Sequence, residues 1–282
     1  MGASSSHLGI DLRQPFRTEI DSVTHAETST AVRIIARLDV KGPHLIKGVH
    51  LEGLRKVGSP VDFARAYYEA GIDEILFMDV VASLYGRNQF LDVLQETAKE
   101  VFVPITVGGG VRSQEDFEVL LRNGADKIAI NTAAHQNPKL ISDFSRRFGS
   151  QAVVVSIEAR KVGSGQWEAL TDNGRERTGR DVLQWSVEAT QLGAGEVLIT
   201  SVDREGTRSG FDVDLVAAIA DRVECPIVAS GGMGSVQDFV NLASSVDVGG
   251  IAAADALHFK RVSIREIRET AFRSGVGVRL DV

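Results

Sequence analysis

The chain has 282 residues, long enough for one large domain, and 43% of them are hydrophobic, which is enough for a sizeable core. The formal net charge of −7 argues against nucleic acid or an anionic membrane as a partner, because neither attracts an acidic protein. The single cysteine excludes an intrachain disulfide and a cysteine-rich zinc site. No apolar run approaches the roughly 18 residues that span a membrane, so the composition predicts a cytoplasmic enzyme.

Residues 1–31 differ in composition from the rest of the chain. They are polar, rich in Ser and Thr, and show no sustained hydrophobic period. They also lack the apolar core of a secretory signal. We therefore expect a disordered N-terminal extension over residues 1–31, followed by a folded domain over residues 32–282.

From Arg33 onward, short apolar runs alternate with longer amphipathic segments. Each run consists mostly of β-branched or small residues and is bounded by Gly, Pro, Asp or Asn, as in parallel strands buried on both faces. The runs are Arg33–Leu38, Glu74–Met78, Pro104–Val107, Lys127–Ile130, Ala152–Ile157, Glu196–Thr200, Pro226–Ala229 and Gly249–Ala253. Segments with one apolar face predict helices at Val61–Ala70, Phe90–Val101, Asp116–Arg122, Asp181–Leu192 and Leu215–Val223. Eight alternating strand and helix units predict a single α/β domain of the (β/α)8 TIM-barrel class, with a doubly wound open sheet as the alternative.

The folded part repeats itself at a spacing of about 122 residues. Gly71–Leu76 aligns with Gly193–Leu198, and Pro104–Gly110 aligns with Pro226–Gly232. Such a repeat predicts two four-strand half-barrels related by an approximate twofold axis.

Two glycine turns follow strands at repeat-related positions. Gly109-Gly110 comes after the third predicted strand and Gly231-Gly232 after the seventh. Glycines at such turns let backbone N–H groups approach an oxyanion closely, although a lone pair of this kind is more often a tight turn. The repetition predicts two phosphate sites on opposite sides of the barrel mouth, with Asn131 and Thr132 beside the first. This arrangement fits an elongated bisphosphate.

Acidic residues end two opposed strands. Asp39 ends the first predicted strand and Glu158 the fifth, so both should face the mouth. Two opposed carboxylates can divide into general acid and general base, whereas the alternative is a pair of solvated loop acids. Lys47, Asp79, Asp203 and Glu205 also lie just past strand ends, where each is either a site residue or a surface salt-bridge partner. None of the six histidines has metal-ligand spacing, so no metal and no cofactor is predicted.

Several ordered motifs resemble the cyclase subunit of imidazole glycerol phosphate synthase, from about Arg33 to the C-terminus. They are RIIARLDV at 33–40, VGGGV at 107–111, GADKIAINT at 124–132, GSQAVVV at 149–155, TSVDREGTRSG at 200–210 and ASGG at 229–232. The resemblance implies a synthase subunit that takes ammonia from a glutaminase partner, closes an imidazole ring on a ribulosyl bisphosphate and releases an aminoimidazole carboxamide ribotide. It places Asp39 and Glu158 at the family's two catalytic acids. It also adds Gly206, Thr207 and Ser230 to the site, and Ala254 and Asp255 to the second phosphate site.

The resemblance extends to the opposite end of the barrel. Arg33, Glu74, Lys127 and Glu196 open the first, second, fourth and sixth predicted strands and match the family's ammonia gate. A closed ring of these charges implies a glutaminase docked on the N-terminal face of the barrel. The alternative is ordinary stabilisation of that face, since conventional barrels also place charges there.

Four positions depart from the family pattern. Glu158 and Glu205 stand where the family has Asp, Arg37 where it often has Cys, and Asp255 where it usually has Ser. These departures leave open a paralogue that delivers ammonia for amidination of a surface sugar, or a non-catalytic scaffold that activates a glutaminase. A phosphoribosyl isomerase with the same half-barrel repeat is a further alternative, and it should lack the charged gate.

Overall fold

The computed structural model describes Met1, residues 31–80 and residues 84–280. The predicted N-terminal extension therefore lies, apart from its two end residues, outside the described residues. No helix of the described chain is long and apolar enough to cross a membrane.

Eight parallel strands close into a barrel. They pair in the order β10-β11-β12-β1-β4-β5-β6-β7, and β7 pairs in turn with β10, which closes the ring. Their bounds are β1 (Arg33–Lys41), β4 (Glu74–Asp79), β5 (Ile105–Gly108), β6 (Lys127–Ile130), β7 (Val153–Gly163), β10 (Glu196–Ser201), β11 (Ile227–Ser230) and β12 (Gly250–Ala253). Each predicted run forms one of these strands. The TIM-barrel prediction is confirmed, and the closure excludes the open sheet.

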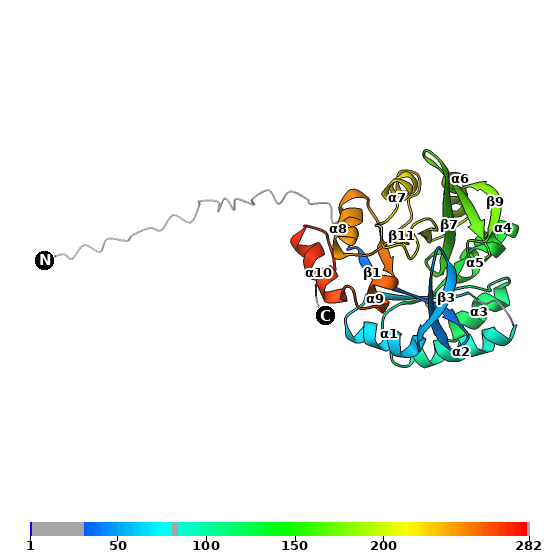
Figure 1. Cartoon of the computed structure of the whole chain (residues 1–282), viewed down its shortest axis with the longest axis horizontal. Coiled ribbons are helices and arrows are strands. Elements are labelled where there is room, and N and C mark those ends of the chain that lie inside the picture. Colours follow the sequence, from blue (N-terminus) through cyan, green and yellow to red (C-terminus); the bar gives the residue numbers. More distant parts are fainter. Residues whose placement is uncertain (2–30, 81–83, 281–282) are drawn as a thin grey trace.

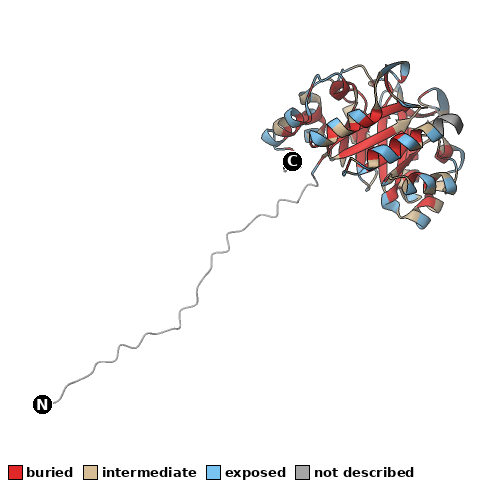
Figure 2. Cartoon of the chain, turned by 90° about the horizontal axis from the view of Figure 1, so that it is seen from below, coloured by how far each residue is buried: buried red, intermediate tan, exposed pale blue. Residues whose placement is uncertain are grey.

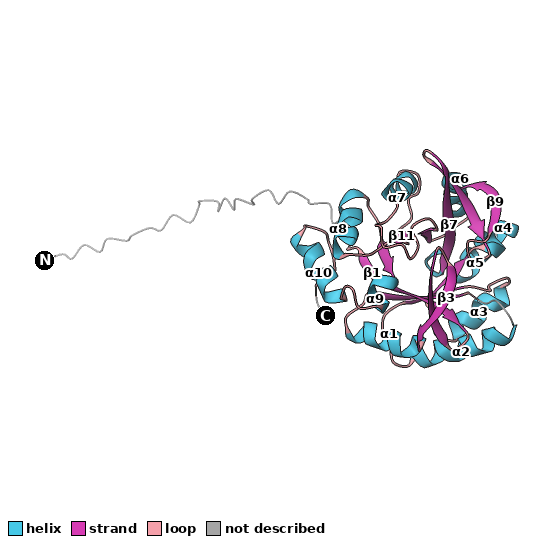
Figure 3. Cartoon of the chain, in the orientation of Figure 1, coloured by secondary structure: helices cyan, strands magenta, loops and turns pink. Residues whose placement is uncertain are grey.

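Helices surround this barrel (Figures 1 and 3). Their apolar faces pack on the strands and their polar faces meet solvent, as the burial pattern in Figure 2 shows. The longer ones are α1 (Pro60–Glu69), α2 (Leu84–Ala98), α3 (Gln114–Arg122), α5 (Lys139–Phe148), α6 (Val182–Gln191), α7 (Val213–Ala220), α8 (Val236–Ser245) and α10 (Ile264–Arg273). The short ones are α4 (Thr132–Gln136) and α9 (Asp255–His258), with a 3-10 turn at Ser150–Ala152. The five predicted helices are confirmed, with ends that move by up to six residues.

Two antiparallel extensions of the barrel strands lie where the sequence analysis predicted no strand. β1 continues to Lys41 and pairs antiparallel with β2 (His44–Val49), which pairs with β3 (Glu52–Gly58). In the other half-barrel β7 pairs antiparallel with β8 (Gln166–Thr171), which pairs with β9 (Glu176–Asp181). Both hairpins rise from the C-terminal ends of their strands, so they form walls at the barrel mouth.

The internal repeat is visible in the backbone. Ser113 and Ser235 each form a capping box with an aspartate three residues on, at φ −142° and −140°. The residues that precede α4 and α9, Asn131 and Ala254, have φ −127° with ψ −84° and φ −125° with ψ −80°. The two halves therefore present nearly the same backbone at the mouth.

The barrel interior is layered along the strands, because alternate residues of each strand point inward. A cluster of buried apolar side chains fills the middle: Ile35, Leu76, Ala129, Val154, Leu198, Val228 and Ala252. Two residues toward the N-terminal strand ends lie the charged Arg33, Glu74, Lys127 and Glu196, whereas among the described residues two positions toward the mouth only Arg37 is charged.

Candidate active site

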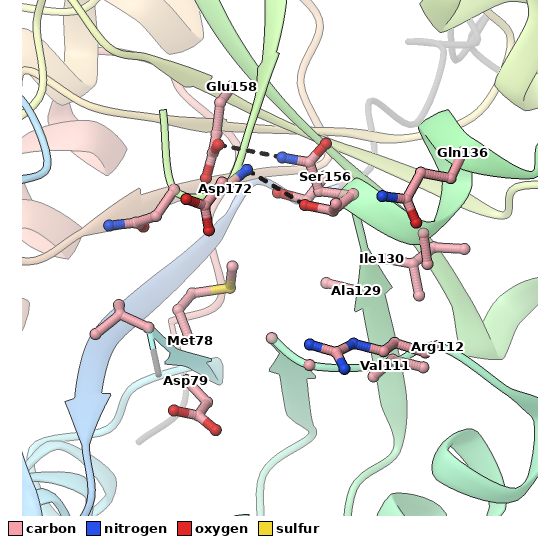
Figure 4. Close-up of a pocket in the computed structure, with 17 residues that line it drawn as sticks. Met78, Asp79, Val111, Arg112, Ala129, Ile130, Gln136, Ser156, Glu158 and Asp172 are labelled. Carbon is pink, nitrogen blue, oxygen red and sulfur yellow. Dashed lines mark hydrogen bonds between the residues drawn. The ribbon is translucent and has the colours of Figure 1, made fainter. Parts of the chain in front are cut away.

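An open cavity of about 410 Å³ lies at the C-terminal ends of β4, β5, β6 and β7. Its wall contains several residues that the sequence singled out, namely Asp79, Gly109, Gly110, Asn131, Thr132 and Glu158. Figure 4 shows Glu158 and Asp172 on one side of this cavity, and Asp79 and Arg112 on the other. The predicted mouth is therefore open over one half of the barrel.

The first half-site consists of Gly109, Gly110, Asn131 and Thr132. Gly109 and Gly110 have φ of +104° and +67°, in the left-handed region that favours glycine. A Cβ on Gly109 would lie 2.1 Å from the backbone oxygen of Asp79, so no other residue fits this turn. The hydroxyl of Thr132 accepts a hydrogen bond from the backbone N–H of Asp172 at 3.3 Å.

Three cavity residues were missed by sequence reasoning. Arg112 follows the first glycine turn and adds an exposed cation to the wall. Asp172 and Asn173 form the turn between β8 and β9, both with positive φ. In the described part of the chain, the buried Nδ2 of Asn173 and Oδ1 of Asn131 have no hydrogen-bond partner. Two such atoms in one cavity wall point to a polar ligand there.

Glu158 is 4% exposed and lies in the wall of this cavity. Its Oε2 accepts hydrogen bonds from the backbone N–H of Gly174 (2.7 Å) and from Nδ2 of Asn131 (3.1 Å). Burial raises the pKa of Glu158 to about 7, against the lowering effects of the Gly174 bond and of Arg37. This carboxyl therefore exchanges its proton near neutral pH, as a general acid should.

The pKa of Asp39, on the opposite strand β1, is shifted in the other direction. Burial alone would raise the pKa of Asp39, but Arg37 and Lys47 outweigh it and lower that pKa below its ordinary value. Arg37 Nε donates to Oδ1 at 2.9 Å, and Lys47 Nζ lies 3.7 Å from Oδ2. Asp39 is 3% exposed and does not line the open cavity, so the structure brings Glu158 but not Asp39 to its surface.

The second half-site consists of Gly231, Gly232, Ala254 and Asp255, and it is almost filled. Gly231 and Gly232 have φ of +93° and +114°, yet the crevice between them and Asp255 has a volume of only about 10 Å³. Arg208 donates to both carboxylate oxygens of Asp255, at 2.6 and 3.2 Å, and Arg261 lies 3.5 Å from the same carboxylate. These cations compensate the acid that departs from the family pattern.

The remaining predicted site residues divide into two groups. Glu205, Gly206 and Ser230 line the second half-site, and buried Glu205 forms an ion pair with buried Lys47. Asp203 and Thr207 instead form hydrogen bonds with backbone groups outside the half-sites. The exposed Asp203 accepts a hydrogen bond from the N–H of Lys161 at 2.8 Å, and the Thr207 hydroxyl donates to the oxygen of Arg204 at 2.7 Å.

Arg33, Glu74, Lys127 and Glu196 form a closed ring of ion pairs at the N-terminal end of the barrel, below called the ion-pair ring. Arg33 contacts both glutamates, and Lys127 lies 2.7 Å from Glu74 and 2.8 Å from Glu196. Because β1 and β10 are not neighbours, the Arg33–Glu196 pair crosses the barrel interior. The four charges that the sequence predicted to meet do so, directly below the apolar cluster.

Metal ligands are not gathered in the described residues, where no group of three or more His, Cys, Asp or Glu side chains is placed to hold an ion.

Together the fold and the site define a (β/α)8 barrel of two related halves, with paired glycine turns and two buried acids at one end and a ring of charges at the other. The chain belongs to the histidine biosynthesis protein family, whose model matches residues 33–263. The resemblance inferred from the motifs is thereby confirmed.

Its relatives include three proteins named imidazole glycerol phosphate synthase subunit HisF. That of Legionella pneumophila is 61% identical over 208 residues, which cover 74% of this chain and 98% of the relative. That of Streptococcus mutans is 46% identical over 247 residues, which cover 88% of this chain and 98% of the relative. That of Mycobacteroides abscessus is 44% identical over 259 residues, covering 89% and 100%.

Proposed function

We propose that this chain is the cyclase subunit of an imidazole glycerol phosphate synthase. In this role it uses ammonia from a glutaminase to close an imidazole ring on a ribulosyl bisphosphate. The observation that carries the proposal is a pair of buried acids on opposed strands of one barrel mouth, Asp39 and Glu158. The pKa of Asp39 is lowered and that of Glu158 is raised. Family membership and the names of the relatives support the same activity.

The two acids divide the proton transfers in this proposal. Ionised Asp39 accepts a proton from the nitrogen that adds to the substrate, and protonated Glu158 donates one to the departing group. Because Asp39 is 3% exposed, Lys47 or the β2–β3 hairpin that carries it must move to admit the substrate. The phosphates would bind at the two half-sites, the first with Arg112 and the second with Arg208 and Arg261.

Turnover of the ribulosyl bisphosphate with ammonium salt at high pH tests this activity without a partner. We expect consumption of the bisphosphate with release of one aminoimidazole carboxamide ribotide for each substrate consumed. No turnover at any ammonia concentration, with substrate shown to bind, would exclude the cyclase.

The ion-pair ring is the proposed entrance for ammonia, and a glutaminase is the proposed partner on that face. Gel filtration of the chain with the glutaminases of its organism should give a 1:1 complex. The double variant Glu74→Gln/Glu196→Gln should change glutamine-supported turnover much more than ammonium-supported turnover. Equal effects on both would leave the ring a structural feature only.

A second candidate is a paralogue that delivers ammonia to another synthetase for amidination of a surface sugar. The observation that favours it is the nearly filled second half-site, with Asp255 in place of a neutral residue. Binding of a glutaminase without any turnover of the bisphosphate would support this candidate, or a non-catalytic scaffold that activates the glutaminase.

A further inference from the structure

Arg37 carries a fully buried charge inside the barrel, and the proposed chemistry above gives it no role. The guanidinium is 1% exposed and reaches from β1 to two other strands. Its Nη1 donates to the hydroxyl of Thr200 on β10 at 2.8 Å and to that of Ser230 on β11 at 3.1 Å. Its Nε donates to Oδ1 of Asp39 at 2.9 Å. These bonds fix the guanidinium between three strands.

Arg37 lies in a polar layer of the barrel interior, with the hydroxyls of Thr200 and Ser230, directly above an apolar layer. The inward residue one layer below on β1 is Ile35, and Leu198 and Val228 face it from β10 and β11. Burial of an unpaired charge is costly, so a buried arginine persists only where it is fully paired and hydrogen-bonded. Nε and Nη1 of Arg37 have such partners, and one of these partners, Asp39, is a candidate catalytic acid.

Charged groups from several elements face Asp39, and Arg37 is its closest cation. Lys47 on β2 is 3.7 Å away and makes its shorter contact with Glu205. His258 on α9 and Glu158 on β7 are also close enough to Asp39 for an electrostatic interaction. Burial and the charge of Lys47 lower the pKa of His258 to about 4. His258 is therefore neutral at pH 7, which leaves Arg37 and Lys47 as the cations beside Asp39.

We propose that Arg37 is a positioning residue. By holding Oδ1 of Asp39 from a guanidinium anchored on β10 and β11, it fixes the orientation and the charge of Asp39 as a proton acceptor. This inference deepens the proposed cyclase function and rests on it for its catalytic consequence. The electrostatic part concerns the state of one carboxylate and is measurable without turnover.

The variants Arg37→Met and Arg37→Lys separate charge from geometry. Methionine removes the charge at similar length, whereas lysine keeps the charge but loses the three-way hydrogen bonding. Arg268→Met is the matched control, because Arg268 is also buried and pairs with an aspartate, Asp73, at 2.9 Å, away from the barrel mouth.

The pH profile of kcat/KM, measured with free ammonia held constant, should change most in Arg37→Met, less in Arg37→Lys and not at all in Arg268→Met. In Arg37→Met the acid limb should move upward by about one pH unit or more, which lowers kcat/KM by roughly tenfold at a pH that lies on the acid limb of both proteins. Arg37→Lys should move it less, and Arg268→Met should leave it unchanged. An acid limb in Arg37→Met that coincides with that of the unmodified protein would overturn the inference.

Carbon-13 NMR of the Asp39 carboxyl, assigned by comparison with Asp39→Asn, gives a result that does not depend on activity, and its measurement on the unmodified protein does not depend on the stability of any Arg37 variant. In the unmodified protein the resonance should stay at its ionised position from pH 5 to pH 8, and in Arg37→Met it should titrate within that range. Titration of Asp39 within that range in the unmodified protein overturns the role of Arg37. Absence of turnover with an ionised Asp39 instead overturns the cyclase proposal alone.

Discussion

The two half-sites have nearly the same backbone conformation but differ in the volume that their side chains leave unfilled. Both have a glycine pair with positive φ and a short helix that begins at nearly the same dihedral angles. The first opens into a cavity of about 410 Å³, whereas the second keeps about 10 Å³. Thr132 begins the helix of the first half-site, and the charged Asp255 begins that of the second.

The cations of the half-sites also come from different places. Arg112 follows the first glycine turn, but its repeat-related position holds Gly234, where a Cβ would lie 2.6 Å from the oxygen of Arg208. The second half-site takes its cations from Arg208 and Arg261, and both contact Asp255. The repeated scaffold therefore gives both half-sites the same backbone, while their side chains differ in charge and in the space that they leave.

The largest expected effect concerns the two acids, one from each half-barrel. Asp39→Asn and Glu158→Gln keep size but remove proton transfer, so each should lower ammonium-supported kcat by about 10²-fold or more. The KM for the bisphosphate should change less, because in the proposed binding mode the phosphates lie at the half-sites and not at the acids. Steady-state kinetics at fixed free ammonia measures both constants, and near-normal kcat in both variants would remove these acids from the mechanism.

The stability of the protein should also report the unusual state of Glu158. A carboxyl whose pKa is raised on folding binds more protons in the folded chain, so stability falls as pH rises from 4.5 to about 7. Glu158→Gln removes this loss and should raise the free energy of unfolding by about 3 kcal/mol at pH 8. At pH 4 the variant and the unmodified protein should be equally stable by urea denaturation, and a gain of the same size at both pH values would contradict the raised pKa.

Thr132→Asp should make the first half-site resemble the second. The new carboxylate would repel a phosphate, because Arg112 is exposed and compensates it only in part. Affinity for inorganic phosphate, measured by titration calorimetry, should fall by roughly tenfold, a change of about 1.4 kcal/mol. Thr132→Asn is the control with the same shape and no charge, and an equal loss in that variant would show that the effect is steric.

Asp255→Thr is the reverse exchange and should have the smallest effect. It frees Arg208 and Arg261 and enlarges the crevice, so affinity for the bisphosphate should rise by roughly threefold to tenfold. Asp255→Asn frees the same cations without enlarging the crevice and should give a smaller gain. Weaker binding in both variants would mean that Asp255 holds the arginines in the arrangement that the substrate needs.

Much of the fold was predictable because the barrel strands are buried on both faces. Runs such as Glu196–Thr200 read as continuous apolar segments between turn residues, and the residues at their ends were the ones to examine. The ion-pair ring was predicted from the resemblance to the cyclase family, and its four members are the first residues of four strands. The repeat placed the two glycine turns opposite each other.

The hairpins and the contacts across the barrel were not predictable in this way. β3 and β9, with sequences EGLRKVG and ERTGRD, are largely exposed and polar, so they lack the apolar alternation that identifies a strand. Because these strands were not predicted, there was also no indication from the sequence that the Asp172-Asn173 turn between β8 and β9 lines the cavity. The bonds of Arg37 to Thr200 and Ser230 join residues more than 160 positions apart, and only the closed barrel brings them together.

The proposed reaction is tested most directly by following nitrogen from ammonia into product. The purified chain, without any glutaminase, is incubated with the ribulosyl bisphosphate and 15N-labelled ammonium salt at high pH, and the products are examined by NMR. The mechanism predicts one 15N atom in each imidazole ring, formed in step with the aminoimidazole carboxamide ribotide. Bound but unchanged bisphosphate, or products without 15N in the ring, would contradict it.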